Sequence, residues 1–533
     1  MKRRTFLKTA AGTSAAAGAG VFGILKYPRG ANASGWGTWP ADREDLLIPA
    51  ELRPQSVLEL CFHGGITAWE TFYARDDWGA GDNTFTNLFD DAPGDGSPRG
   101  FYDQVCGYAA SGHPFVSPFG VDAAGTEIGL GPWLYPLKNR PDILSRMRVL
   151  VQSHTILAHE GANPVSFTGD FVGNPRMAGL GAPIQRYFNE QPGGSRAVPY
   201  SYILYPGGAG FSGFNVGSAS AIGFHPGAAR PLNVTVSQDS VLAELLSRPG
   251  LAQSNPEAFD AAVSYYTQAY ENRFRSGGVG KAARSLERNN YEFANFARQN
   301  AQELIDVLPP SLFANVGGQT CPAGGAYGVV TDNATDMPAM MANVARSLLT
   351  RETNPARYVN WIDTGIFPRP EIGYDVHNEH VLYTARSVPH TLQQLADIIA
   401  EPDDDDPTLI NLDETMVVIN MEFGRTPGRQ VPGSSGTNHW PFGYVNVVIG
   451  GPIREGGGSP GASYYGNILP PGDSQAGNAE NFITPTENRV MMLAALGIYP
   501  FSSQSYAVAD VRFRDTEIDA LERVRDELWG ISV

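Results

Sequence analysis

Residues 415–451 read TMVVINMEFGRTPGRQVPGSSGTNHWPFGYVNVVIGG, and this stretch decides the fold that we expect. Two nearly continuous apolar runs, 416–421 and 445–450, flank a long loop of glycine, proline and serine. Such runs, rich in valine and isoleucine, are typical of central strands that are covered on both faces. A polar loop at the carboxyl end of such a strand is where open α/β sheets place their binding sites. The candidate site residues in this loop are Glu422, Arg425, Asn438 and His439.

Outside this stretch, apolar runs and helical patterns alternate along the chain. Helices are predicted at 337–349 and 384–400, where apolar residues recur at three- and four-residue spacing. Strands that alternate with helices indicate a mostly parallel sheet with helices on both faces. We therefore expect one α/β domain over residues 34–533. Its predicted strands are 56–62, 148–152, 201–205, 358–362, 415–421 and 445–450.

A long helical block at 255–308 interrupts this alternation. It is rich in alanine, glutamate, arginine, glutamine and aromatic residues, and Pro256 suits the first turn of a helix. Glycines at 277, 278 and 280 break the block, so we interpret it as a helical hairpin inserted between sheet elements. Its charged face is explained most simply by contact with solvent, and a partner-binding role is the alternative.

The first 33 residues predict an export signal rather than part of the fold. KRRTFLK at 2–8 is a twin-arginine pattern, a weakly apolar run follows to Leu25, and ANA at 31–33 supplies a cleavage site. A membrane-anchoring helix is the weaker alternative, because the run is short and rich in glycine. We expect a periplasmic or secreted product of the twin-arginine pathway, with no membrane span after cleavage.

Composition narrows the classes of partner. A formal net charge of −17 argues against nucleic acid and anionic membrane surfaces. The three cysteines, Cys61, Cys106 and Cys321, are too widely spaced for a zinc knuckle or a disulfide framework. We expect Cys61 to be buried in its apolar run, and pairing of Cys106 with Cys321 stays open. The acidic run 403–406 lacks the ligand spacing and the glycine of a calcium loop, so we interpret it as a solvated turn.

Two short motifs do not carry a function in this sequence. GAGFSG at 208–213 fits G-x-G-x-x-G after a predicted strand. The run after it is not expected to open a helix, and no acid stands about 20 residues further on, so a dinucleotide site is not predicted. GGSPG at 457–461 fits a nucleophile elbow but has no strand before it and no helix after it. We interpret both motifs as loop glycines.

The nine histidines are more informative, because most of them follow predicted strands. His63 directly follows the strand at 56–62, and the two glycines after it allow a tight turn and a close approach to a ligand. The carboxyl ends of parallel strands meet at one edge of a sheet, so four such loops would share one site. A hydrogen-bonded structural role is the alternative for any single histidine. The candidates are His63, His154, His159, His377, His380 and His439, with Asp375 beside them.

Six segments of the chain occur in an order that resembles a known family. They are FHGGITAWETF, HEGANPVSFTGD, GYDVH, TMVVINMEFGRTP, GTNHW and VNVVIGG. From about residue 56 to residue 496 the chain is similar to the domain-of-unknown-function family 1501, whose exported members are similar to the alkaline phosphatase and sulfatase superfamily. The EFGRTP segment with the later histidine is the most specific part. The resemblance implies a three-layer α/β sandwich that holds divalent metals with Asp and His at the strand ends.

The same resemblance implies where the site residues lie. The superfamily nucleophile stands nine residues before a Thr-Gly pair similar to Thr168-Gly169, and that position is His159 rather than a hydroxyl residue. His159 could attack the substrate, act as acid or base, or ligate a metal. Asn438 stands where the superfamily has an acid of its metal-binding pair, and this replacement is expected to weaken metal binding. Whether the site holds one metal ion or none stays open. The implied metal ligands are His63, Asp375, His377, Asn438 and His439.

Two functions from different classes follow as alternatives. The first is a metal-dependent hydrolase or transferase that acts on phosphate or sulfate esters of small molecules or glycans, with zinc, manganese or calcium as the metal. Its catalytic candidates are His159, Arg425 and Glu422, and Glu70 stands near the place expected for a further acid. Arg425 suits a phosphate or sulfate oxygen through its planar fork, although an ion pair with Glu422 is equally open. The second function is a catalytically inactive binding or assembly protein on the same fold.

Overall fold

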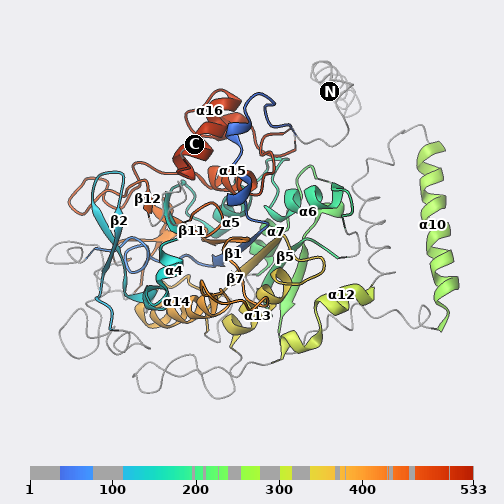
Figure 1. Cartoon of the computed structure of the whole chain (residues 1–533), viewed down its shortest axis with the longest axis horizontal. Coiled ribbons are helices and arrows are strands. Elements are labelled where there is room, and N and C mark those ends of the chain that lie inside the picture. Colours follow the sequence, from blue (N-terminus) through green and yellow to red (C-terminus); the bar gives the residue numbers. More distant parts are fainter. Residues whose placement is uncertain are drawn as a thin grey trace, which may run out of the picture. The chain divides into compact units, whose positions relative to one another are not determined.

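The structure of the chain is a computed structural model (Figure 1). It describes residues 37–75, 112–194, 198–207, 212–225, 227–237, 254–276, 301–314, 336–366, 373–377, 380–428, 430, 436–454, 463–502 and 504–531. Three predicted features lie outside these residues: the signal peptide at 1–33, the pair Cys106 and Cys321, and the GGSPG motif at 457–461.

One eight-stranded sheet lies at the centre of the described chain. Its strands are β1 (Ser56–Phe62), β4 (Met147–Gln152), β5 (Ser201–Pro206), β6 (Leu232–Val236), β7 (Tyr358–Asp363), β8 (Thr415–Asn420), β11 (Tyr444–Ile449) and β12 (Ser463–Tyr465). Their order across the sheet is β12-β4-β11-β8-β1-β7-β5-β6. β11 is antiparallel to β4 and β8, whereas every other pairing is parallel. Seven strands therefore share one direction, and their carboxyl ends lie at one edge.

The mostly parallel α/β sheet predicted from the sequence is confirmed. All six predicted strands are present, and each end lies within one residue of its predicted position. The two other strands lie at the edges of the sheet, where apolar runs are short or absent. In β6 exposed and buried residues alternate, and β12 has only three residues. Neither sequence differs enough from that of a loop for a strand to be predicted there.

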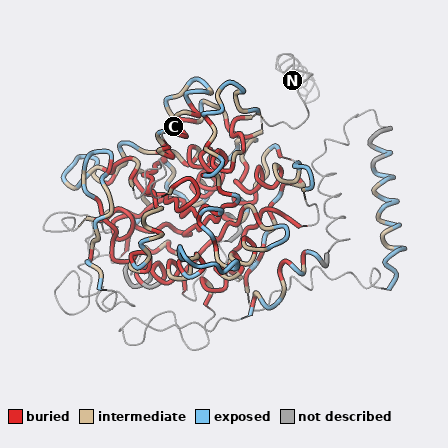
Figure 2. Tube along the Cα trace, viewed as in Figure 1, coloured by how far each residue is buried: buried red, intermediate tan, exposed pale blue. Residues whose placement is uncertain are grey.

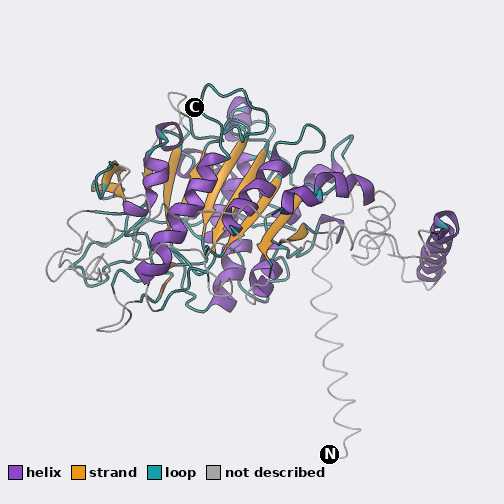
Figure 3. Ribbon diagram, turned by 90° about the horizontal axis from the view of Figure 1, so that it is seen from below, coloured by secondary structure: helices purple, strands orange, loops and turns teal. Residues whose placement is uncertain are grey.

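Helices cover both faces of the sheet (Figure 3). The helix predicted at 337–349 is confirmed in full, and the one predicted at 384–400 begins earlier, at His380. One face carries α13 (Met337–Leu349), which packs against β5 and β7, and α14 (His380–Asp397). The other carries α5 (His159–Thr168), α6 (Gly181–Glu190), α7 (Ser212–Ala219) and α15 (Pro485–Ala495).

Helix α7 corrects one expectation. We expected no helix after the GAGFSG motif, yet α7 begins at Ser212, inside the motif. Glycine weakens a helix by only about 1 kcal/mol per residue, and packing of α7 against β5 and α5 outweighs that cost. The motif thus precedes a helix, but the acid expected of a dinucleotide site is still missing from the sequence.

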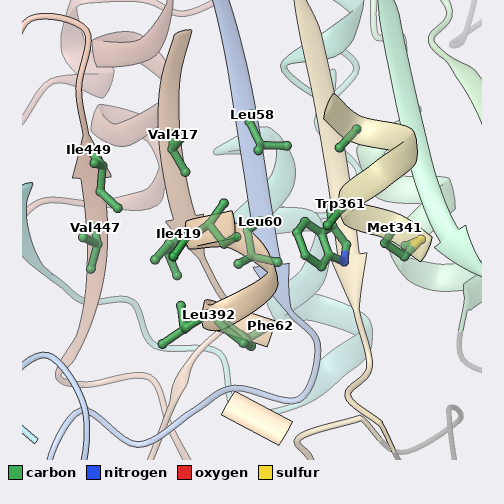
Figure 4. Close-up of a cluster of buried hydrophobic side chains, with 14 of the residues drawn as sticks. Leu58, Leu60, Phe62, Met341, Trp361, Leu392, Val417, Ile419, Val447 and Ile449 are labelled. Carbon is green, nitrogen blue, oxygen red and sulfur yellow. The ribbon is translucent and has the colours of Figure 1, made fainter. Parts of the chain in front are cut away.

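Strand β1 shows how the sheet separates an apolar face from a polar one. Leu58, Leu60 and Phe62 alternate along β1 and meet Met341 of α13 and Leu392 of α14 in the apolar core (Figure 4). Successive side chains of a strand point to opposite faces, so the residues between them face α5 and α15. Those residues are Glu59 and Cys61, and His63 follows directly after the strand; all three are buried. The centre of the described chain is buried throughout (Figure 2).

The remaining elements are small or peripheral to the sheet. Two helices, α10 (Pro256–Ser276) and α12 (Ala301–Val307), fall within the predicted helical insertion at 255–308. Residues 403–406 are exposed, as expected of a solvated segment, and the turn assigned there covers residues 402–403. Among the described helices, none combines the length and the apolar character that a membrane span needs. The smaller described elements include β2 (Ser117–Val121), β3 (Glu127–Leu130), β9 (Gly424–Arg425), β10 (His439–Trp440), α3 (Tyr135–Lys138), α4 (Pro141–Leu144) and α16 (Glu517–Glu522).

Candidate metal centre

The loops after three parallel strands, β4, β7 and β8, meet at the carboxyl edge of the sheet. His159 begins α5, a few residues after β4, and Asp375 and His377 lie in the loop between β7 and α14. Glu422 and Arg425 follow β8, and the short pairing of β9 with β10 brings His439 beside Arg425. The topology of the sheet thus brings His159 and Asp375 together, although more than 200 residues separate them in the sequence.

The carboxylate of Asp375 is the centre of this cluster. One oxygen, Oδ2, lies 3.1 Å from Nε2 of His159. The other, Oδ1, lies 3.0 Å from Nε2 of His377 and 3.0 Å from Nε2 of His439. Arg425 donates from Nη2 to the same Oδ1 at 2.7 Å. Three imidazoles and one guanidinium therefore face a single carboxylate.

Each of the three imidazoles is held from behind through its other nitrogen. Nδ1 of His159 lies 3.0 Å from Oε1 of Glu422, and Nδ1 of His439 lies 2.6 Å from the carbonyl oxygen of Leu157. Nδ1 of His377 lies 3.0 Å from Oε1 of Gln430. These oxygens accept hydrogen bonds, so Nδ1 carries the proton of each neutral ring. The lone pair on each Nε2 then points at Asp375.

Lone pairs that face a carboxylate at such distances repel it unless a proton or a metal ion lies between them. Protonation of all three imidazoles would set four positive charges, with Arg425, against the carboxylates of Asp375 and Glu422. A divalent cation needs neutral imidazoles and a carboxylate, with each imidazole oriented by a second oxygen, and the cluster has this composition. Ligand atoms of His159, Asp375 and His439 all lie within 4.8 Å of one another. The residues present therefore fit a metal ion.

The charges of the cluster also set its protonation in the absence of a metal. Burial lowers the pKa of His159, but hydrogen bonds and charge from Asp375 and Glu422 outweigh it and raise this pKa to about 9. Burial likewise opposes ionisation of Asp375, yet the three imidazoles and Arg425 hold its pKa well below the usual range. A proton on His159 thus competes with a metal ion for the same nitrogen.

Arg425 is almost wholly buried, with 1% of its surface exposed. Its Nη2 donates to Asp375 and, at 3.0 Å, to the carbonyl oxygen of Tyr374. The sequence left open an ion pair between Arg425 and Glu422. In the structure, Arg425 instead forms its ion pair with Asp375. Among the described residues, no acceptor meets its Nε or Nη1. A buried guanidinium with donors to spare suits an anionic ligand.

Two predicted metal ligands lie outside this ring of nitrogens. His63 is buried beside Glu422, with 3.6 Å between its Nδ1 and Oε1, and Asn215 of α7 approaches the same Nδ1 at 2.6 Å. Asn438 is exposed, and its side-chain oxygen accepts the backbone N–H of His439 at 2.9 Å. Glu70 faces His380 rather than the cluster.

Three further groups position the cluster; the sequence placed one of them, His154, among the candidates for a shared site and gave no role to the other two. His154 donates from Nε2 to the carbonyl oxygen of Glu422 at 2.6 Å, while its Nδ1 accepts the N–H of Ile156. Its place directly after β4 was the available signal. Nothing in the sequence distinguishes Gln430, in a loop of mixed composition, or the carbonyl of Leu157. Backbone and amide acceptors of this kind leave no recognisable pattern.

Residues 371–466 match the model of a family described as protein of unknown function (DUF1501). No curated protein matches the chain. The matched segment holds five members of the site: Asp375, His377, Glu422, Arg425 and His439. His63 and His159 precede it, so the site joins the matched segment to an earlier part of the chain.

Proposed function

We propose that this protein is an exported, metal-dependent hydrolase or transferase that acts on phosphate or sulfate esters and has an alkaline-phosphatase-like fold. The observation that carries the proposal is the convergence of three imidazole Nε2 atoms on Asp375, each with its Nδ1 held by an oxygen. The twin-arginine pattern and the cleavage site at 31–33 support a periplasmic or secreted location.

The residues that would hold the metal are His159, Asp375, His377 and His439. A set of three nitrogens and one carboxylate favours zinc or manganese over calcium, which prefers an all-oxygen shell. A bound divalent cation would polarise an ester oxygen and stabilise charge that develops on it. Asn438 has no part in this set, because its amide oxygen serves the backbone of His439.

Arg425 supports an anionic substrate. Its Nη2 is fixed by Asp375 and Tyr374, so the guanidinium is oriented before any substrate binds. Its Nε and Nη1 remain to donate to oxygens of a phosphate or sulfate group, and a planar fork of donors matches such oxygens well. Burial strengthens these contacts because water does not compete for the donors.

His159 is a ligand rather than a nucleophile in this proposal. Both of its nitrogens are engaged, Nδ1 with Glu422 and Nε2 with Asp375, so neither is left to attack. Ser166, one nearby hydroxyl, donates to the carbonyl oxygen of Met421 at 3.0 Å and is buried. We therefore expect a water molecule or an acceptor hydroxyl to attack the ester directly. Glu422 holds His159 in place through Nδ1.

The test is metal content together with ester turnover. The mature protein, purified after native export, should carry one zinc or manganese ion per chain and hydrolyse p-nitrophenyl phosphate or p-nitrophenyl sulfate. His439→Ala should lose both properties. His113→Ala, which alters an imidazole whose described partner is Asn139, should lose neither. Absence of metal from the folded wild-type protein would overturn the proposal, and metal without turnover of any ester would favour the binding or assembly protein instead.

A further inference from the structure

Behind the cluster lies a second histidine and carboxylate pair that the proposed chemistry does not use. Glu70 and His380 have no exposed surface, and Nε2 of His380 lies 3.5 Å from Oε2 of Glu70. Apart from His380, neither oxygen of Glu70 has a polar partner among the described residues. Burial of an ionised carboxylate costs roughly several kcal/mol unless an opposite charge or hydrogen bonds offset that cost. An apolar pair of the same size would stabilise the fold more simply.

This pair leads to the metal-binding loops through one threonine. Nδ1 of His380 lies 3.2 Å from Oγ1 of Thr437, two residues before His439. The backbone N–H of Thr437 donates to the carbonyl oxygen of Val376 at 3.3 Å. Val376 stands between Asp375 and His377, so Thr437 joins both segments that supply the cluster.

The order of donors along this chain is fixed by Glu70. A carboxyl oxygen of Glu70 faces Nε2 of His380, and such an oxygen favours the tautomer that carries its proton on Nε2. Nδ1 is then an acceptor, and the hydroxyl of Thr437 donates to it. Without Glu70 either tautomer of His380 is available, and the hydroxyl of Thr437 loses its single preferred orientation.

We propose that Glu70 and His380 are positioning residues for the metal centre, which act through Thr437 to set the spacing between the Asp375–His377 segment and His439. The inference rests on the proposed function, because it assumes that these segments bind a metal. Oxygen partners that orient metal ligands from behind change metal affinity by about 10-fold to 100-fold when they are removed. Here Glu70 and His380 act on the metal-binding segments through one intervening residue, Thr437.

The chain offers a matched control on the same helix. His390 of α14 is also buried, and its Nε2 lies 2.9 Å from both oxygens of Asp336, the residue that caps α13. This pair joins two helices, and its hydrogen bonds among the described residues link α14 to Asp336 and Ala339 at the start of α13, away from the cluster. Loss of His390 therefore reports what a buried histidine and carboxylate pair on α14 contributes to the fold alone.

The experiment measures Co²⁺ binding to the metal-free mature protein by titration and by visible absorption, which depends on coordination geometry. Wild type, Thr437→Val, Glu70→Leu, Glu70→Gln and His390→Asn are compared, each checked for folding by circular dichroism. Thr437→Val keeps the shape of the side chain and removes only the hydroxyl. We expect about 10-fold weaker binding and an altered spectrum in Thr437→Val and Glu70→Leu. Glu70→Gln, whose carbonyl can still accept from His380, should be close to wild type, and His390→Asn should match wild type.

The outcomes separate the two proposals. If wild type binds Co²⁺ and Thr437→Val binds it equally well with the same spectrum, the positioning role is wrong and the proposed function stands. An equal loss in His390→Asn would also overturn it, because the effect would then be a general loss of stability. If folded wild type binds no Co²⁺, the proposed function fails and this inference fails with it.

Discussion

Arg425 is the side chain on which the proposed binding of an anionic substrate beside the metal depends. It is buried, its Nη2 is fixed on Asp375, and its Nε and Nη1 have no acceptor among the described residues. Arg425→Lys keeps the charge and loses the fork, so we expect kcat/KM for the ester that is turned over to fall about 100-fold. Metal content should stay at the wild-type level.

The control for Arg425 is Arg454→Lys, since Arg454 pairs with Asp413 at the opposite edge of the sheet. Its kcat/KM should equal that of wild type. Unchanged kcat/KM in Arg425→Lys would show that the guanidinium fork does not contact the reacting group.

The burial of His225 predicts that the folded protein loses stability in acid. Burial, assisted by the positive charge of Arg186, lowers its pKa to about 3. The unfolded chain binds a proton near pH 6.5 and the folded chain does not, so stability rises with pH across this window and falls as the solution is acidified. Between pH 7 and pH 5 this residue alone should cost roughly 2 kcal/mol of unfolding free energy.

Urea unfolding at both pH values tests this. His225→Gln has no charge to gain, so its loss of stability between pH 7 and pH 5 should be smaller than that of wild type by that amount. Parallel losses in the two proteins would mean that His225 is protonated without penalty in the fold.

The turn at the end of β1 shows why glycine is needed beside the cluster. Gly64 has φ +97°, and a Cβ there would lie 2.1 Å from the backbone nitrogen of Asp375. Gly125 has φ +79° but no atom within 4 Å of such a Cβ. Alanine at either position meets similar backbone strain of about 1–2 kcal/mol, and only at Gly64 does it displace the backbone of Asp375.

We therefore expect Gly64→Ala to bind zinc at least about 10-fold more weakly than Gly125→Ala, measured by titration of the metal-free proteins. Both variants should be destabilised in urea, Gly64→Ala by more. Equal zinc affinity in the two variants would contradict the close approach of β1 to Asp375.

Strand β1 also carries a buried ion pair. Glu59 lies against Arg489 of α15, with 2.6 Å between Oε1 and Nη2, and it also accepts from Asn420 of β8 and Tyr358 of β7. Both charges are fully buried. Glu59→Gln leaves Arg489 without its counter-charge, so we expect a loss of about 3–5 kcal/mol of unfolding free energy. Urea unfolding measures it.

A double-mutant cycle with Arg489→Met separates the pair from the packing around it. The double variant should lose about 2 kcal/mol less than the sum of the two single variants. Strict additivity would show that the two charges do not stabilise each other.

The same elements show how far the sequence could predict the fold. Central strands such as β1 and β8 are buried on both faces, and their continuous apolar runs identified them. Edge strands such as β6 give no comparable signal. Helix α7 was missed because its glycines suggest a loop, and only its packing against β5 and α5 makes it helical. Tertiary contacts of this kind cannot be derived from local composition.

At the scale of the whole molecule, the parallel arrangement of β1, β4, β7 and β8 is what assembles the site. The sequence predicted that histidine loops after these strands would meet, and the structure brings His159, Asp375, His377 and His439 together. The sequence could not predict which residues contact Asp375 directly and which lie behind those residues. That order depends on hydrogen bonds such as those of Asn438 and His63, which follow from the exact course of the loops.

A metal ion held by ligands from three such distant segments should stabilise the whole fold. A ligand that binds only the folded chain adds about 2.7 kcal/mol at 100 times its dissociation constant. The wild-type protein should therefore unfold at a higher temperature with zinc than with a chelator, measured by scanning calorimetry. His439→Ala, which lacks one of the converging nitrogens, should unfold at nearly the same temperature in both conditions. If wild type also unfolds at one temperature in both, the imidazoles around Asp375 hold protons rather than a metal, and the charge of the cluster is balanced by its own residues.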